Sequence, residues 1–234
     1  MATSWSDIVT NHAMVVIDDE RLNELSQSNP AVFFRRMSLY VKNAIPLFNR
    51  PPEMLTRLKT GLVEPQFDDF TYDPDETILS EDTTIETLMT GYDICCCESA
   101  TTDEDGNAVY ETVTDFTYDP DTGAIVLKAG NHGEFYCFDF YKDGEFGNDL
   151  TDWQKRILGL CVASVWEERF FRNWLNDTPK IKDQSFTTVN EATYMREGEA
   201  KKIKNRAQLN DELRDYEQKC AYRSVFPFKT TTLL

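Results

Sequence analysis

The strongest hydrophobic pattern of the chain runs from Asn148 to Leu175 and predicts a long helix. Thr151 and Gln154 have the spacing of a capping box, in which each side chain satisfies a free amide at the start of the helix. Apolar residues then recur at three- and four-residue intervals, which is the period of a helix. They are Trp153, Ile157, Leu160, Cys161, Val165, Phe170 and Trp174, widened by Leu158, Val162, Trp166 and Phe171. Because so broad an apolar surface needs cover on several sides, we expect this helix to be the centre of the fold.

The first 63 residues also have helical patterns. The clearest one predicts a helix with Asn29 as its N-cap and Pro30 in its first position, where the missing N–H of proline costs nothing. Apolar residues follow at helical spacing as far as Ile45, and Pro46 should end or kink the helix. Shorter helices are expected around residues 5–9, 18–25 and 53–59.

From Tyr92 onward the period changes from helical to alternating, which is typical of strands. Four strands are expected, at Tyr92–Ser99, Ala108–Tyr118, Ala124–Lys128 and Glu134–Tyr141, and glycine-containing turns separate them. The short connections predict sequential antiparallel pairing, that is, a four-stranded meander. Residues 61–80 are interpreted as a loop or irregular strand, and residues 84–90 as a short helix.

The sequence FTYDPD occurs twice, at Phe70–Asp75 and Phe116–Asp121. Phe, Thr and Tyr favour strands, whereas Asp-Pro-Asp favours a turn. We interpret both copies as a strand that leads into a turn, in preference to a duplicated domain.

After a polar linker at Asn176–Thr188, residues 189–225 predict a long polar helix, either continuous or broken near Gly198. Its apolar stripe is narrow, which fits a helix on a surface or in a coiled coil better than a core helix. We therefore expect an interface with a partner or another copy, formed by this stripe and the C-terminal tail. Its candidate residues are Leu209, Leu213, Tyr216, Phe226 and Phe228.

These elements predict an α+β fold: a helical body with an inserted antiparallel β-meander of about four strands and a long C-terminal helical region. The expected divisions are an N-terminal helical part at 1–63, a β-rich insertion at 64–147, and residues 148–234 with the central helix, the C-terminal helix and an extended tail. We expect residues 1–63 and 148–225 to form one domain.

The distribution of charge is more informative than the net charge of −17. No Lys or Arg lies between Lys59 and Lys128, and that interval holds 18 acidic residues, whereas the rest of the chain has 24 basic and 23 acidic residues. The simpler interpretation is a solvated surface that aids solubility, and the sharper one is a surface that repels DNA or receives a basic partner. The candidate surface residues are Asp68, Asp69, Asp73, Asp75, Asp103 and Asp105.

The sequence contains none of the phosphate-binding, dinucleotide-binding, nucleophile-elbow or zinc-protease motifs. The only histidines are His12 and His132, which leaves little scope for imidazole catalysis or a Cys/His metal site. With 18 acidic residues in one interval, close pairs of carboxylates are expected by chance, so such a pair does not by itself indicate a catalytic or metal site. The loop at Asp103 and Asp105 lacks the twelfth-position Glu of an EF-hand, although weak cation binding at Asp119 and Asp121 stays open. We expect no enzyme activity, no cofactor and no metal.

Six cysteines include the consecutive Cys95, Cys96 and Cys97, which cannot form a regular disulfide framework. In a strand their side chains must alternate between the two faces, and packed, reduced thiols are preferred to redox chemistry. No apolar run is long enough to span a bilayer, and the N-terminus does not have the pattern of a signal peptide. We therefore expect synthesis in a cytosolic compartment and no membrane partner.

The order of these elements resembles the neck, or head–tail connector, proteins of tailed bacteriophages. The resemblance covers most of the chain. It is carried by Ser28–Met37 and Tyr40–Phe48, by the β region that ends at Phe135–Tyr141, by Leu150-Thr151-Asp152 before the Trp-containing helix, and by the charged helix that ends near Tyr222-Arg223-Ser224.

The resemblance implies a non-enzymatic virion protein made in the host cytoplasm. Such proteins form rings, commonly of twelve copies, in the neck beneath the portal protein, and contact other neck or tail proteins. Packaged DNA passes through the ring without sequence-specific binding, so an acidic segment that lines the ring would keep DNA from adhering. The alternative is an acidic DNA mimic that inhibits a nucleic-acid-binding protein. A carboxylate-based hydrolase or transferase is a third hypothesis, and no motif supports it.

Overall fold

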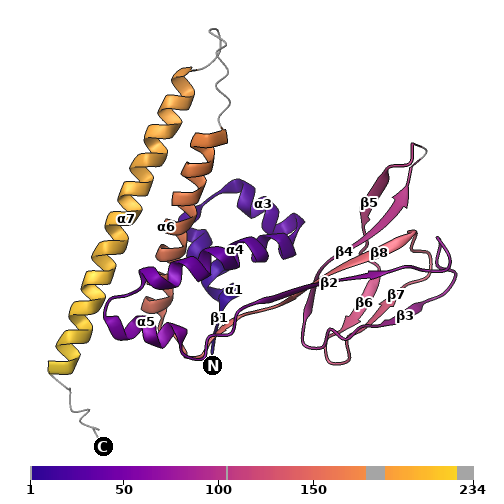
Figure 1. Cartoon of the computed structure of the whole chain (residues 1–234), viewed down its shortest axis with the longest axis horizontal. Coiled ribbons are helices and arrows are strands. Elements are labelled where there is room, and N and C mark those ends of the chain that lie inside the picture. Colours follow the sequence, from indigo (N-terminus) through magenta and orange to yellow (C-terminus); the bar gives the residue numbers. More distant parts are fainter. Residues whose placement is uncertain (1, 104, 178–187, 226–234) are drawn as a thin grey trace, which may run out of the picture. The chain divides into compact units, whose positions relative to one another are not determined.

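The computed structural model describes residues 2–103, 105–177 and 188–225 and has an α+β fold. The chain folds into two compact units (Figure 1). The helical unit consists of Met1–Asp18, Leu39–Val63 and Phe146–Leu234, and the β unit consists of Asp19–Ser38 and Glu64–Glu145. Over the described part of the chain, no helix is both long and apolar enough to cross a bilayer.

The centre of the helical unit is α6 (Asp152–Asp177), at the position that the hydrophobic pattern predicts. Its capping box is confirmed, because the Thr151 amide donates to Gln154 Oε1 at 2.9 Å and the Gln154 amide donates to Thr151 Oγ1 at 3.4 Å. Ile157, Leu158 and Cys161 are fully buried. The apolar surface is therefore covered at these positions, as its width requires, while the side chains of Phe170, Phe171 and Trp174 lie outside the described part of the structure.

The N-terminal segment packs against α6 as one nearly continuous helical run. It consists of α1 (Trp5–Asp7), the π-helical η1 (Ile8–Ala13) and α2 (Met14–Ile17). The short strand β1 (Thr3–Ser4) precedes it and pairs with β9 (Glu145–Phe146). Contact with α6 is tight at Gly159, where a Cβ atom would lie 2.7 Å from His12 Cβ and 2.8 Å from the His12 carbonyl carbon. The absence of a side chain at Gly159 allows the two backbones to approach.

Of the remaining N-terminal helices, the one predicted after the Asn29 cap begins at Pro30 as expected. The remaining elements are α3 (Glu20–Ser28), α4 (Pro30–Ala44), the 3-10 turn η2 (Ile45–Leu47) and α5 (Pro52–Lys59). Asp19 Oδ1 accepts from the Leu22 amide at 2.9 Å, and Asn29 Oδ1 accepts from the Val32 amide at 3.0 Å. Both side chains therefore satisfy free amides at a helix start.

The C-terminal helix α7 (Thr188–Val225) is continuous and runs alongside α6 (Figure 1). Gln154 of α6 is 2% exposed, and its Nε2 donates to Tyr216 Oη of α7 at 2.5 Å. Trp153 of α6 donates its indole N–H to Glu212 Oε2 at 2.7 Å and meets the Tyr216 ring edge-on at 5.2 Å. Polar and aromatic contacts thus reinforce the thin apolar stripe of α7.

Gln154→Ala should lower the free energy of unfolding by about 2–3 kcal/mol, because it removes half of a helix cap and a buried hydrogen bond together. Urea unfolding followed by tryptophan fluorescence measures the loss, since all four tryptophans belong to the helical unit. Gln208→Ala is the matched control on the exposed side of α7, with an expected change within about 0.5 kcal/mol. Equal effects of the two substitutions would contradict the proposed role of Gln154.

The β unit is built from two antiparallel sheets that enclose one core (Figure 1). The larger sheet has the order β2-β8-β4-β5, and the smaller sheet has the order β3-β7-β6. The strands are β2 (Gln66–Tyr72), β3 (Thr83–Glu86), β4 (Asp93–Thr102), β5 (Ala108–Thr112), β6 (Phe116–Asp119), β7 (Ala124–Leu127) and β8 (Phe135–Lys142). Tyr136, Phe138 and Phe140 of β8 are fully buried in the core between the sheets.

The predicted four-stranded meander is wrong in its pairing and its strand count. The second expected strand, Ala108–Tyr118, divides into β5 and β6, which belong to different sheets. The last strand, β8, does not pair with β7 but lies between β2 and β4. The physical reason is burial: β8 is apolar on both faces except at Asp139 and takes a central position, whereas all five residues of β5 are exposed at an edge.

Two local predictions need correction. The interpretation of residues 61–80 as a loop or irregular strand is right only in part, because Gln66–Tyr72 is the regular strand β2, which pairs with β8 over its whole length. The expected helix at residues 84–90 is instead the strand β3 and the bend after it. Residues 83–85 are Thr-Thr-Ile, and these β-branched side chains favour a strand over a helix.

Both FTYDPD copies are strands that lead into turns, as expected, because the first copy begins in β2 and the second begins in β6. The phenylalanines of the two copies pack into the same core from opposite sheets. The ring of Phe70 lies 6.4 Å from that of Phe138, and the ring of Phe116 lies 6.2 Å from it. The recurrence is thus explained by two strands that deliver an aromatic side chain to one central residue.

Candidate functional site

The acidic interval forms an exposed surface over the β unit. Of its 18 acidic residues, 16 are exposed and Glu98 is half-buried, while Glu104 lies outside the described residues. The β unit as a whole has 25 acidic and 5 basic residues, a net charge of −20, whereas the helical unit has 16 acidic and 19 basic residues, a net charge of +3. The charge asymmetry in the sequence is therefore an asymmetry between two structural units.

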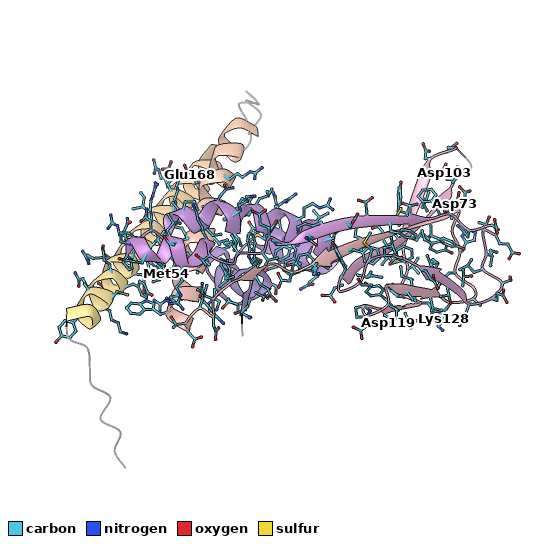
Figure 2. All side chains as sticks on the ribbon, turned by 60° about the horizontal axis from the view of Figure 1, so that its bottom comes forward. Met54, Asp73, Asp103, Asp119, Lys128 and Glu168 are labelled. Atoms are coloured by element: carbon cyan, nitrogen blue, oxygen red, sulfur yellow. The ribbon has the colours of Figure 1, made fainter. Side chains whose placement is uncertain are left out.

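The six acidic residues singled out in the sequence do not converge on one point. Asp68 and Asp69 lie in β2, Asp73 and Asp75 follow it, and Asp103 and Asp105 lie in the turn between β4 and β5. Figure 2 shows Asp73 and Asp103 at the periphery of the β unit. All six are exposed, so they belong to an extended negative surface and not to a confined site.

The carboxylates in the turns accept hydrogen bonds from backbone amides and side chains of the same turns. Asp103 Oδ1 accepts from the Asp105 amide at 3.0 Å and from the Asn107 amide at 2.7 Å, so these bonds hold the pKa of Asp103 below its usual value. Asp119 accepts from the Asp121 amide and from Thr122 Oγ1, which also lowers its pKa. No group of three or more metal-binding side chains occurs among the described residues. The geometry gives no support to cation binding at Asp119 and Asp121.

The three consecutive thiols are packed and protonated. Burial raises the pKa of Cys95 to about 12, of Cys96 to about 11 and of Cys97 to about 12, with further increases from nearby carboxylates. All six cysteines of the chain are free, and a bulge between Ile94 and Cys96 interrupts the register of β4. Because the thiolate is the reactive form, these groups are unsuited to redox or nucleophilic chemistry at neutral pH.

The larger sheet has one face in the core and one outer face, and the register of its strands fixes the residues on each. On the outer face, Thr71 lies opposite Cys137, which lies opposite Glu98 in turn. In the next row, Asp69, Asp139 and Cys96 are neighbours across the three strands. One end of this face is covered within the β unit, since Phe34 stacks on Tyr141 at 4.8 Å and Arg35 lies 5.4 Å from the Phe67 ring.

The residues of α7 that the sequence predicts as an interface are occupied within the chain. Leu209 and Leu213 are 5% and 6% exposed, and Tyr216 contacts Gln154, Trp153 and Phe48. Phe226 and Phe228 lie outside the described residues. The narrow stripe is therefore satisfied by packing inside the helical unit, which leaves the opposite side of α7 as its open surface.

α7 also contains a basic stretch that sequence reasoning missed. Residues 200–210 hold Lys201, Lys202, Lys204 and Arg206 and no acidic residue. Lys204 and Arg206 are exposed, whereas Lys202 is half-buried and Lys201 donates to the Ile17 carbonyl oxygen at 3.1 Å. Ile203 is 70% exposed in the middle of this stretch, and Ala200 and Ala207 are exposed three and four residues away. The sequence signal of this basic stretch is the run without acidic residues between Glu199 and Asp211. It is easily overlooked because acidic and basic residues nearly balance over the whole helix.

A shallow pocket of about 480 Å³ between α6 and α7 is lined by Asp152, Trp153, Arg156, Glu212 and Lys219. Three of its four charged groups engage one another or the tryptophan. Arg156 forms an ion pair with Glu212, and Lys219 Nζ lies 4.5 Å from the Trp153 ring centroid. The pocket contains no nucleophile paired with a base, so its geometry favours the packing of two helices over catalysis.

Glu167 of α6 is a buried acid at the same helix pair. It is 3% exposed, and Asn205 Nδ2 of α7 donates to its Oε1 at 2.5 Å. Burial raises its pKa, although the bond from Asn205 and the charges of Lys201 and Lys202 act in the opposite direction. A raised folded-state pKa means that the contribution of Glu167 to stability is greatest at low pH and is lost as the pH rises through that pKa.

Glu167→Gln should therefore raise the unfolding temperature near neutral pH, because glutamine keeps an acceptor for Asn205 without a buried charge. The difference from the wild type should disappear below about pH 4, where the carboxyl group is protonated in both the folded and unfolded chain. Thermal unfolding across this pH range measures the effect. Glu168→Gln, at the adjacent exposed position, is the control, and a pH-independent gain in both variants would contradict the assignment.

No family model, no curated protein and no solved structure matches this chain.

Proposed function

We propose that this chain is a non-enzymatic structural protein of a tailed-phage virion, a head–tail connector subunit that forms a ring around the DNA channel between portal and tail. The observation that carries the proposal is the separation of charge between the two units. The β unit has a net charge of −20 with most of its carboxylates exposed, and the helical unit is close to neutral. A channel wall that lets DNA pass must repel phosphate, and exposed carboxylates provide that repulsion.

The partners follow from this role. They are further copies of the chain in a ring, twelve by the resemblance, together with the portal protein and other neck or tail proteins. DNA passes the acidic surface without sequence-specific contacts. The long α7 supports a scaffold role, because it is held to α6 by packing and hydrogen bonds on one side and exposes the other. The proposed location of the protein is the neck of the virion.

Sedimentation velocity over a wide concentration range tests the assembly. The proposal expects one closed oligomer with a single mass, in equilibrium with the monomer. A series of masses that grows without limit would indicate an open filament and would contradict a ring. Addition of duplex DNA should leave the sedimentation of the oligomer unchanged, and tight binding of DNA to its outer surface would also count against the proposal.

The second candidate is an acidic DNA mimic that occupies the DNA-binding surface of a basic protein. The exposure of 16 carboxylates in the acidic interval between Lys59 and Lys128 favours it. Its test is competition: the purified chain should displace duplex DNA from basic DNA-binding proteins at moderate salt, and a DNA mimic has no need to form rings. A ring-forming chain that displaces no DNA supports the connector, and a monomer that does so supports the mimic.

A further inference from the structure

The outer face of the larger sheet combines apolar and acidic side chains in a fixed pattern. Its apolar part is formed by Cys96, Cys137 and Phe135, which are half-buried; the Phe135 ring also meets the Tyr110 ring edge-on at 6.3 Å. Carboxylates accompany them: Glu98 lies directly opposite Cys137, and Asp139 directly opposite Cys96. We name the three apolar residues and these two carboxylates, together with Asp69, the docking face.

The strand register places two carboxylates of the docking face directly opposite each other, where they repel. Asp69 and Asp139 are direct partners in the antiparallel ladder of β2 and β8. Like charges directly opposite each other across two strands are destabilising, and a cation brought to this position would relieve the repulsion. The docking face is therefore suited to a partner that carries a positive charge beside a small apolar surface.

The open side of α7 has the complementary pattern. Ala200, Ile203 and Ala207 are exposed at spacings of three and four residues, so they form one stripe. Helical geometry places Lys204 on one side of this stripe and Arg206 on the other, and both are exposed. Residues 200–210 contain no acid, so this part of the helical unit is suited to an acidic surface.

We propose that the α7 stripe of one copy docks on the docking face of the next copy. The apolar stripe would cover Cys96, Cys137 and Phe135, while Lys204 and Arg206 would meet the carboxylates of Glu98, Asp139 and Asp69. The inference rests on the proposed function, since a ring needs a contact between two different surfaces of adjacent subunits. A helix against a sheet face is such a heterologous contact, and it repeats from copy to copy.

Paired charge reversals test the contact. One variant carries Glu98→Lys and Asp139→Lys, so both of its surfaces are basic; the other carries Lys204→Glu and Arg206→Glu, so both are acidic. Each variant alone should lose self-association by roughly tenfold or more, because like charges then face each other. An equimolar mixture should assemble again, since every contact in it joins opposite charges. Light scattering with separation by size measures all three samples.

The mixture distinguishes loss of this contact from misfolding of a variant. A variant that simply misfolded would not be rescued by its partner, and circular dichroism checks each fold beforehand. A control with Asp75→Lys and Glu86→Lys makes the same charge change on exposed positions outside the docking face and should assemble as the wild type does.

Three results would overturn the inference. Wild-type assembly that both variants retain would show that copies meet elsewhere, and the connector proposal would survive. Variants that lose assembly and do not recover when mixed would exclude direct pairing of these surfaces. A wild type that stays monomeric at the highest attainable concentration would overturn the inference and the self-assembled ring together.

Discussion

Phe138→Ala is expected to lower the stability of the β unit by about 3–5 kcal/mol, the usual cost of deleting a buried aromatic side chain. Phe138 is fully buried in the central strand β8. Its ring meets Phe70 of β2 and Phe116 of β6, so it joins both sheets and both FTYDPD copies. The cavity would therefore open at the point where the two sheets depend on each other.

Hydrogen exchange of the β8 amides under native conditions measures this loss, because it reports on the β unit directly. Leu88→Ala is the matched control: it also removes a large apolar side chain, but Leu88 is 96% exposed. Its expected change is within about 0.5 kcal/mol. Similar protection of the β8 amides in the two variants would contradict the position of Phe138 at the centre of the core.

Gly159→Ala should cost about 1–3 kcal/mol in the helical unit, although alanine is the better helix former by about 1 kcal/mol. The added Cβ would lie 2.7 Å from His12 Cβ and 3.0 Å from the His12 carbonyl oxygen. Since backbone atoms form part of this contact, a change of side-chain rotamer cannot relieve it. The N-terminal helical run must move away from α6 and lose buried contacts of Ile8 and Val9.

Urea unfolding followed by tryptophan fluorescence measures the effect, because Trp5 lies in the displaced segment. Ser164→Ala provides the control on the same helix, at a half-buried position, with an expected change within about 0.5 kcal/mol. Gly159→Leu should be more severe than Gly159→Ala. If Gly159→Ala proved more stable than the wild type, helix propensity would be the dominant factor and the close approach of η1 to α6 would be wrong.

The helices could be predicted from the sequence because their signals are local. The capping box of Thr151 and Gln154, the cap at Asn29 and the apolar spacing in α6 each involve residues within a few positions of one another. Such signals do not depend on the rest of the fold. The pairing of α7 with α6 could not be predicted in detail, because the contacts of Tyr216 and Glu212 join residues about 60 positions apart.

The sheets could be predicted only in part, because strand order is a non-local property. The hairpins β4–β5 and β6–β7 follow from their turn residues. The place of β8 between β2 and β4 does not, and β2 was obscured by its acidic residues, since Asp68 and Asp69 are unfavourable in strands. The apolar character of both faces of β8 was the one sequence signal of a central strand.

The candidate site could also be predicted only in part from the sequence. The acidic surface follows from composition, because a run of 18 acids without a base must stay in water. The α7 interface was assigned to the buried side of the helix, since a stripe of Leu209, Leu213 and Tyr216 has the same spacing whether it faces its own chain or a partner. Only the structure distinguishes that side from the exposed one with Ile203.

The most direct test of the connector account is electron microscopy of the purified protein at high concentration, with reconstruction of the assembled particles. The account predicts closed rings with a central hole wide enough for duplex DNA and with the acidic β units toward that hole. Closed particles without a hole, or rings whose inner wall is formed by the basic stretch of α7, would contradict it.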